Sequence, residues 1–161
     1  MSAAPVRMPE ADDQPEWLRL RLALWPQCAL EQHELEMGSV IADADRAAVF
    51  VSPATTPERR GHLAGFVEVA VRAWREGIPG APVAHVEALY VMPEERDRGV
   101  GSALLGAAET WARERGCRAI AADASVGNDR ARALHRHLGY EEGEVRVRLH
   151  KSLDGQGEQR S

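Results

Sequence analysis

Three carboxylates lie within or beside apolar segments of the sequence, where a charged side chain is unusual unless it has a partner or a function. Glu87 lies in the apolar run VAHVEALYV, on the same strand face as His85 and Leu89, where an unpaired carboxylate is costly to bury. Asp123 closes the apolar run AIAAD, and Glu144 begins an alternating segment. A carboxylate can hold an ammonium group or accept its proton, so these residues indicate a site for a cationic substrate.

Each carboxylate also has a purely structural explanation. Glu87 can form a salt bridge with a neighbouring basic residue, Asp123 can cap the loop that follows it, and Glu144 can be a solvated charge at a sheet edge. The chain of 161 residues has 25 acidic and 20 basic side chains, which gives a formal net charge of −5. This charge disfavours general nucleic-acid binding and suits a polycationic ligand, although many enzymes are mildly acidic for other reasons.

A glycine-containing turn, RDRGVG at 96–101, precedes a long amphipathic segment. Spacing excludes two nucleotide-binding motifs, because Leu104 stands where the dinucleotide fingerprint needs a third glycine and no Gly-Lys-Ser/Thr follows the turn. Flexible glycines, the N–H groups of a helix start and two arginines can still hold an anion such as a pyrophosphate. An ordinary helix start is the alternative.

Hydrophobic periodicity predicts the elements that position these residues. Helices are expected at 15–25, at 29–42 with a weak point at Gly38, from Val100 to Gly116, and at 129–138; strands are expected at 4–8, 47–51, 63–71, 83–91, 119–124 and 145–149. This order predicts an α/β fold in which a mixed sheet has helices on both faces. We expect one domain over residues 1–153 and a disordered tail at 154–161.

Other classes of protein are disfavoured by composition. Two cysteines, Cys28 and Cys117, are too few for a disulfide framework and are expected as buried free thiols. The histidines and cysteines lack metal-ligand spacing, so no metal is expected. No long apolar run or secretory signal is present, so we expect no membrane association and a cytoplasmic protein.

Two segments together resemble the GCN5-related N-acetyltransferases, the GNAT superfamily. Leu89-Tyr90-Val91-x-Pro93 followed by Arg96-x-x-Gly99-x-Gly101 is similar to their coenzyme A signature, and Asn128-x-x-Ala131-x-x-Leu134-His135-x-x-x-Gly139-Tyr140 is similar to their second segment. The resemblance implies a mostly antiparallel central sheet and acetyl-CoA as cosubstrate. It implies coenzyme contacts from the backbone of Leu89, Tyr90 and Val91, from the turn Arg96, Asp97, Arg98, Gly99, Val100, Gly101 and Ser102, and from Asn128, which can also simply cap its helix.

A narrower resemblance, to the aminoglycoside 6′-N-acetyltransferases, spans about residues 7–153. It is carried by Leu20-Arg21-x-x-Leu24-Trp25-Pro26, Val86-Glu87-Ala88-Leu89-Tyr90-Val91, Ala122-Asp123-Ala124 and Leu138-Gly139-Tyr140-Glu141-Glu142-x-Glu144. The resemblance implies substrate contacts from Trp25, Glu87, Asp123 and Glu144. Because a carboxylate can accept the proton of an ammonium group, Glu87 and Asp123 are also the candidate catalytic residues. Trp25 can otherwise be a packing residue.

The family also implies an aromatic residue in the loop before the Glu87 strand. Trp74 is nearest, although the loop is shorter here. His135 stands where many members have the tyrosine that protonates the leaving thiolate, a step that histidine can also perform. Tyr140 matches a packing position, and a homodimer is expected by resemblance.

These observations favour an acetyl-CoA-dependent aminoglycoside 6′-N-acetyltransferase that confers antibiotic resistance by direct transfer in a ternary complex. Three alternatives stay open: a GNAT enzyme acting on a polyamine, a peptide N-terminus or a small amine; a non-catalytic acetyl-CoA sensor; and an interaction module.

Overall fold

The structure is a computed structural model that describes residues 5–72 and 82–154. One mixed sheet contains β1 (Ala47–Pro53), β2 (Leu63–Arg72), β3 (Val83–Val91) and β4 (Ala119–Ala122), in that spatial order. The first three strands are antiparallel neighbours, and β4 runs parallel to β3. Because a parallel pair needs a crossover, the helix α3 (Val100–Glu114) links β3 to β4. The predicted mixed, mostly antiparallel sheet is confirmed.

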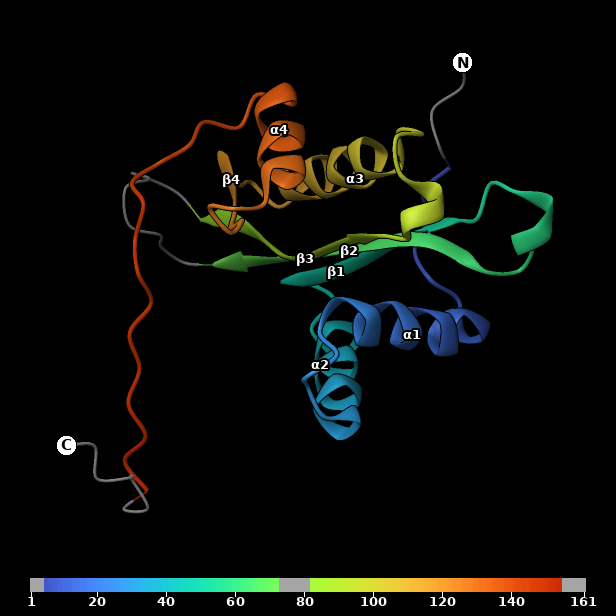
Figure 1. Cartoon of the computed structure of the whole chain (residues 1–161), viewed down its shortest axis with the longest axis horizontal. Helices are drawn as coiled ribbons and strands as arrows, with labels where there is room; N and C mark the ends of the chain where they lie inside the picture. The colour runs from blue at the N-terminus through green and yellow to red at the C-terminus, as the bar shows by residue number, and fades with distance from the viewer. Residues whose placement is uncertain (1–4, 73–81, 155–161) are drawn as a thin grey trace. The chain divides into compact units, whose positions relative to one another are not determined.

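Helices cover both faces of the sheet (Figure 1). The helices α1 (Gln14–Leu24) and α2 (Leu30–Ala42) lie on one face, and α3 lies on the other. The α1 helix starts with Pro15 in its first turn and stops before Pro26, as proline geometry favours. The α2 helix continues through Gly38, so it is not interrupted there, and a weakening at that glycine stays a prediction.

The core forms between α1, α2 and the sheet. Its members are buried apolar side chains from these elements: Trp17, Leu20, Met37, Val49, Val51, Leu63, Phe66 and Ala88. On the other face, the predicted stripe of α3 buries Val100, Leu104, Ala108 and Trp111. The helix was predictable because one apolar stripe at this spacing has to face a sheet or another helix.

The two cysteines are free thiols. Cys117 is buried, and burial raises the pKa of its thiol, whereas Cys28 is only half-buried, contrary to expectation. Within residues 5–72 and 82–154, no group of three or more potential ligands could hold a metal ion. No helix in the same ranges is long and apolar enough to span a bilayer.

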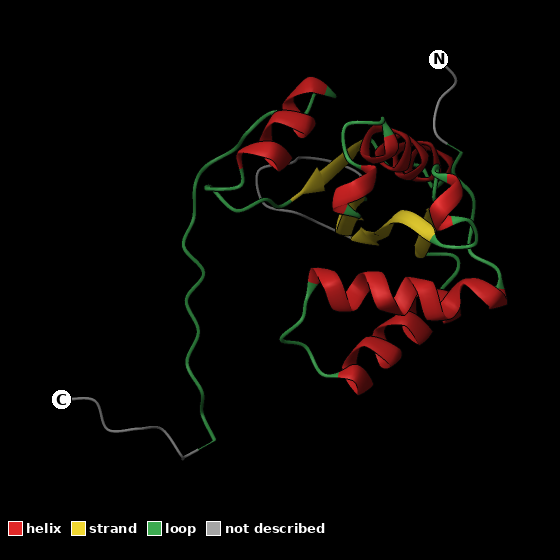
Figure 2. Cartoon of the chain, turned by 45° about the vertical axis from the view of Figure 1, so that its right-hand side comes forward, coloured by secondary structure: helices red, strands yellow, loops and turns green. Residues whose placement is uncertain are grey.

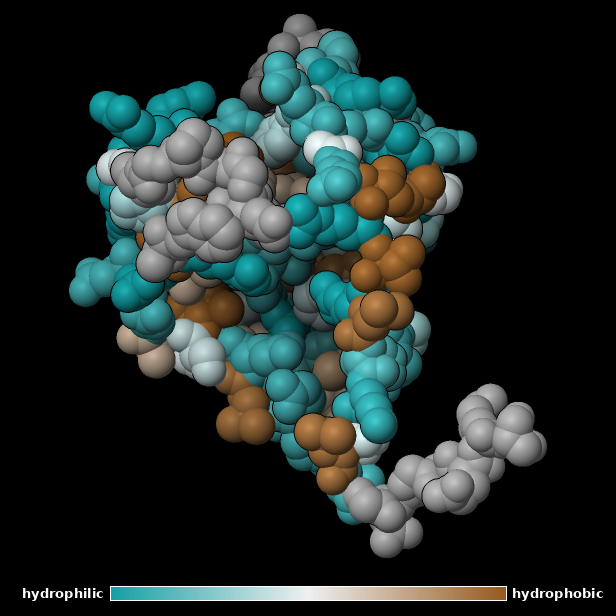
Figure 3. Space-filling model, turned by 90° about the vertical axis from the view of Figure 1, so that its left-hand side faces the viewer, coloured by the Kyte–Doolittle hydropathy of each residue, from teal (hydrophilic) through white to brown (hydrophobic). Residues whose placement is uncertain are grey.

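Two predicted strands differ from the structure. Arg7 makes a single bridge with Val51 in place of a strand at 4–8. Residues 145–149 are drawn as a loop (Figure 2), and the side chains of Val145, Val147 and Leu149 are exposed. Their alternation indicated a half-buried strand, but none of the described strands pairs with them, so the predicted strand is wrong. Exposed apolar groups are visible among hydrophilic ones in Figure 3.

The chain divides into two compact units, residues 1–124 and residues 125–161. The first contains the sheet and α1 to α3; the second contains α4 (Asp129–His137). The assignment of residues 1–153 to one domain stays a prediction, and most of the expected tail, 155–161, lies outside the described residues.

A buried ion pair joins α1 to the sheet. One guanidinium nitrogen of Arg21 donates to both carboxylate oxygens of Glu68 on β2, and the indole of Trp17 donates to Glu68 at 2.9 Å. Arg21 also donates to Nδ1 of His33 at 3.1 Å and to the carboxylate of Glu36, both on α2. Because Arg21 and Glu68 are almost fully buried, this polar network fixes how α1 and α2 meet the sheet.

Replacing Glu68 by leucine should lower the free energy of unfolding by about 3–5 kcal/mol, because Arg21 would lose its buried carboxylate partner and keep only the partly exposed Glu36. The double variant Arg21→Met/Glu68→Leu should lose less than the sum of the single losses. Urea unfolding measures both. Additive losses would show that the ion pair does not couple the helix to the sheet; Glu34→Leu, on the exposed side of α2, is the control.

Close approach of β2 and β3 depends on Gly65. A Cβ atom added there would lie 2.5 Å from the carbonyl oxygen of Tyr90 and 3.2 Å from Cα of Val91. Real Cβ atoms do not approach backbone so closely, so any side chain at position 65 would push the end of β3 away.

The substitution Gly65→Ala should therefore destabilise the protein by about 1–3 kcal/mol, measured by urea unfolding. The matched control is Gly106→Ala, because Gly106 is exposed inside α3 and has open space at its Cβ position. Alanine there should stabilise by about 0.5–1 kcal/mol through helix propensity. Equal effects of the two substitutions would contradict the close-approach role of Gly65.

Candidate active site

The pairing between β3 and β4 stops after four residues of each strand. It runs from Val83 opposite Ala119 to Val86 opposite Ala122, after which β4 ends and β3 continues. We call the point after Val86 and Ala122, where β3 and β4 separate, the fork. Beyond the fork, β3 pairs with β2, and no other strand among the described residues pairs with its second edge. The backbone at 87–91 therefore has an open edge of the kind that accepts an extended ligand as an added strand.

A β-bulge places Glu87 at the fork. Glu68 of β2 lies opposite Ala88, and the next residue, Val69, lies opposite Val86, so Glu87 is the extra residue of β3. Bulges re-aim a side chain and are frequent beside active sites. Here the flanking residues Val86 and Ala88 are buried, whereas the side chain of Glu87 is 35% exposed. The carboxylate thus reaches solvent from an otherwise apolar strand.

Asp123 follows the last residue of β4, so the fork brings two of the three predicted carboxylates to one place. A histidine joins them: Nδ1 of His85 lies 3.3 Å from Oε2 of Glu87, and Nε2 lies 3.3 Å from Oδ2 of Asp123. The imidazole is 6% exposed, whereas the Asp123 side chain is 64% exposed. Sequence reasoning placed His85 on the right strand face but assigned it no part in the site.

Arg72 contacts Glu87 as well. Its Nη2 atom lies 2.9 Å from each carboxylate oxygen, so the structural explanation of Glu87 as a salt-bridge partner is present too. Partial burial acts to raise the pKa of Glu87, but the imidazole of His85 and the guanidinium of Arg72 outweigh it. The pKa of Glu87 consequently lies below its ordinary value, and the carboxylate is ionised at neutral pH.

The turn after β3 has the backbone geometry of an anion cradle. Asp97 has φ of 64° and Gly99 has φ of 83°, and Gly99 is the residue at which α3 begins. Space is open around Gly99, so glycine is favoured there by the left-handed backbone and not by crowding. The N-cap residue Gly99 has no side chain with which to cap α3, so N–H groups of the first turn can bind another acceptor. An ordinary helix start has the same geometry.

A buried glutamate holds this turn. Glu95, fully buried, accepts hydrogen bonds from the backbone N–H of Thr55 at 3.2 Å and from its hydroxyl at 2.6 Å. Nε of Arg96 donates to the carbonyl oxygen of Val91 at 2.9 Å, and Arg98 donates to Thr55 at 3.2 Å. Both arginines therefore brace the turn. Sequence reasoning missed Glu95, because nothing in the sequence distinguishes it from its exposed neighbour Glu94.

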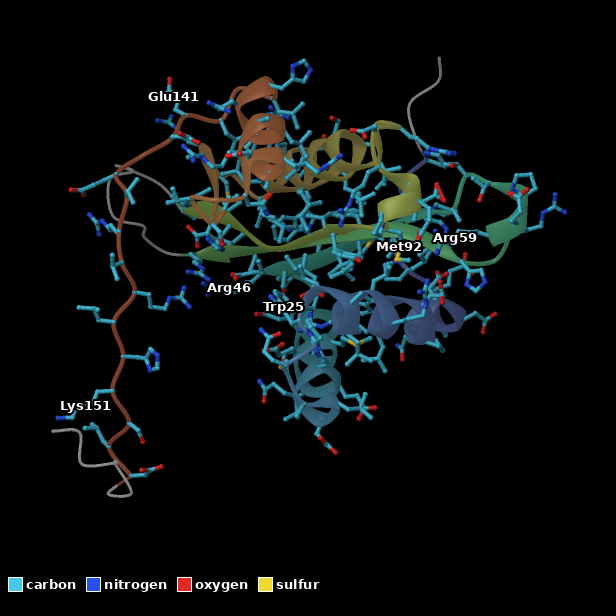
Figure 4. All side chains as sticks on the ribbon, in the orientation of Figure 1. Trp25, Arg46, Arg59, Met92, Glu141 and Lys151 are labelled. Carbon is cyan, nitrogen blue, oxygen red and sulfur yellow. The ribbon has the colours of Figure 1, made fainter. Side chains whose placement is uncertain are left out.

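Trp25 ends α1 on the face of the sheet that α1 and α2 cover (Figure 4). The Arg21 guanidinium lies 5.1 Å from the centroid of its ring, and the ring of His33 stacks at 6.2 Å. Nε2 of His33 lies 3.3 Å from the Trp25 carbonyl oxygen, and it can donate there because Nδ1 accepts from Arg21. The packing role of Trp25 is thus present. Trp74 lies outside the described residues.

Three further candidates belong to residues 125–154. The Asn128 side chain accepts from the N–H of Ala131 at 3.1 Å and therefore caps α4. Nδ1 of His135 lies 2.7 Å from the carbonyl oxygen of Ala131, which can only accept, so Nδ1 carries a proton. Nε2 is buried without a hydrogen-bond partner in the described chain. Glu144 is exposed and pairs with Arg146 at 3.1 Å.

Comparison with known proteins points to one family. The sequence model of the Acetyltransferase (GNAT) family matches residues 12–140. Two relatives are named aminoglycoside N(6′)-acetyltransferase type 1. The protein from Stenotrophomonas maltophilia is 39% identical over 154 residues, covering 95% of this chain and 96% of the relative. The protein from Klebsiella aerogenes is 35% identical over 143 residues, covering 88% and 93%.

A solved structure agrees with these matches. It is that of AAC(6′)-Iy in complex with the bisubstrate analogue CoA-S-monomethyl-acetylneamine, with 30% identity, a TM-score of 0.83, and coverage of 94% of this chain and 99% of that one. Because the family match and both relatives span most of the chain, the protein belongs to the GNAT family of acetyltransferases and has their fold.

Proposed function

We propose that the protein is an acetyl-CoA-dependent 6′-N-acetyltransferase of aminoglycosides, which confers resistance by removing a cationic amine from the drug. The observation that carries the proposal is the fork itself: the carboxylates of Glu87 and Asp123 stand where the open edge of β3 begins. The substrate class named for the relatives from Stenotrophomonas maltophilia and Klebsiella aerogenes supports the same assignment.

The residues divide the work as follows. Glu87 and Asp123 attract the ammonium groups of the substrate, with Trp25, Trp74 and Glu144 as further contacts. The backbone at Leu89–Val91 holds the pantetheine arm, and one of its N–H groups polarises the thioester carbonyl as a small oxyanion hole. The turn at 96–102 takes the pyrophosphate, and Asn128 takes a further polar group of the coenzyme.

Acetyl transfer needs a neutral amine. Glu87 or Asp123 accepts the proton of the ammonium group, and the nitrogen then attacks the carbonyl carbon of the thioester. As the new C–N bond forms and the C–S bond breaks, the nitrogen gives up its second proton to water. The thiolate takes a proton, for which the candidate donor is Nε2–H of a doubly protonated His135. Transfer is direct, within a ternary complex. From resemblance we also infer that the protein is a homodimer and is cytoplasmic. Light scattering of the purified protein measures its molar mass and so tests the dimer.

The first test is thiol release from acetyl-CoA by purified protein with kanamycin or tobramycin, followed by NMR of the product. We expect turnover that acetylates the 6′ nitrogen and leaves the 3″ nitrogen free. If the protein turned over only polyamines, peptides or small amines, the proposed acetyl transfer would stand and the aminoglycoside substrate class would be wrong. Coenzyme binding without turnover for any amine would indicate an acetyl-CoA sensor, and no coenzyme binding would indicate an interaction module.

The variants Glu87→Gln and Asp123→Asn should each lower kcat/KM for kanamycin by at least about tenfold, or about 1.4 kcal/mol of transition-state stabilisation. Each removes a negative charge with little change of shape. The control is Glu34→Gln, an exposed glutamate on α2, which should leave kcat/KM unchanged. Unchanged kinetics in both Glu87→Gln and Asp123→Asn would remove the carboxylates from the proposed site.

A further inference from the structure

His85 lies beneath the fork with both ring nitrogens enclosed. Each nitrogen is buried and lies 3.3 Å from a carboxylate oxygen, yet neither forms an aligned hydrogen bond within the described residues. The residues paired with it are small, with Ala70 on β2 and Ala121 on β4, so no large side chain directly beside it on these strands competes with the ring for space. Burying an imidazole costs free energy unless its nitrogens form hydrogen bonds or its charge is paired with an opposite charge.

The two carboxylates determine which form of the ring fits. A neutral imidazole has one N–H group and one lone pair, so one of its nitrogens would face a carboxylate with like charge density. Only the imidazolium ion carries a proton on both nitrogens and places positive charge beside both Glu87 and Asp123. Arg72 contacts Glu87 as well, so the Glu87 carboxylate lies beside two cationic groups when the ring is protonated.

An incoming ammonium group would add a further cation to this cluster. If it binds between Glu87 and Asp123, it supplies the positive charge that the ring supplied before. Two cations, the ammonium group and the imidazolium ion, would then compete for the same pair of carboxylates, and their repulsion in a partly buried site favours loss of the ring proton.

We propose that His85 holds a proton between Glu87 and Asp123 in the substrate-free protein and releases it when the ammonium group of the substrate binds. The proposal rests on the proposed function. The N–H bond of the imidazolium ion breaks, and the proton passes to water through the exposed Asp123 carboxylate, leaving a neutral ring. His85 is therefore a positioning residue. Its positive charge holds the two carboxylates together while the site is empty, and the charge is lost when the ammonium group of the substrate binds.

This exchange couples substrate affinity to pH. Kanamycin must displace a proton wherever His85 is protonated, so its affinity should rise with pH within the range in which histidine changes charge. A binding reaction that releases one proton changes its Kd by up to about tenfold per pH unit. The amines of kanamycin titrate as well, and comparison with a variant that lacks the imidazole removes their contribution.

The experiment is calorimetric titration of the full-length protein with kanamycin at pH 6 in two buffers of different ionisation enthalpy. We expect wild type to release up to about one proton more per site than His85→Phe, which has a ring but no ionisable group. His85→Gln, which keeps a polar group, should behave as His85→Phe in proton count. The control is His150→Gln, an exposed histidine, which should match wild type.

Equal proton release by wild type, His85→Phe and His85→Gln, with kanamycin bound by all three, would overturn the proposal. Nitrogen NMR of the His85 ring in wild type gives a second reading that does not need the substrate. Both ring nitrogens should carry protons at pH 6, and a neutral ring would overturn the proposal even if His85→Phe fails to fold. Absence of any binding heat with kanamycin would instead count against the proposed function, and the NMR signal would still decide the state of His85.

Discussion

The short parallel pairing of β3 with β4 is the constraint on which the rest of the site depends. Parallel strands bring their carboxyl ends to the same edge, so ending the pairing at Val86 and Ala122 places Glu87 and Asp123 side by side. The same ending leaves hydrogen-bonding groups of β3 open beyond the fork, and backbone groups of this kind need a partner or water. One early strand end thus produces both the acidic site and the edge beside it.

Buried and exposed carboxylates have different tasks in this protein. Glu68 and Glu95 are buried, and each accepts several hydrogen bonds: Glu68 joins α1 to the sheet and Glu95 holds the turn before α3. Glu87 and Asp123 reach solvent and share one imidazole. Glu68 and Glu95 thus hold the framework together. Glu87 and Asp123 present negative charge to solvent from well-ordered strands, as a binding site for cations requires.

Much of the framework was predictable, because apolar periodicity identifies faces that must be buried. The strand at 83–91 and the stripe of α3 follow from local pattern alone. The alternation at 145–149 shows why pattern is insufficient, since it specifies which side chains share a face and not whether a partner strand is present. At the site, the sequence predicted Glu87 and Asp123 but not His85, because its contact with Asp123 depends on the register between β3 and β4.

The bulge at Glu87 and the close approach at Gly65 were also missed. A glycine inside a strand was an available signal for Gly65, since it often marks close backbone approach. No comparable signal marks the bulge, because a single extra residue changes the pairing without changing the apolar character of β3. The ion pair of Arg21 with Glu68 joins residues far apart in the sequence, and its partners could be matched only in three dimensions.

The fork also divides β3 into two halves that differ in how their amide protons meet water. From Val83 to Val86, described strands flank β3 on both sides, so these amides exchange with solvent only when the sheet opens. Beyond Glu87, alternate amides face the open edge and exchange without any opening of the sheet. A ligand seated along that edge would slow the second half and leave the first unchanged, so deuterium uptake within one strand records whether the edge is occupied.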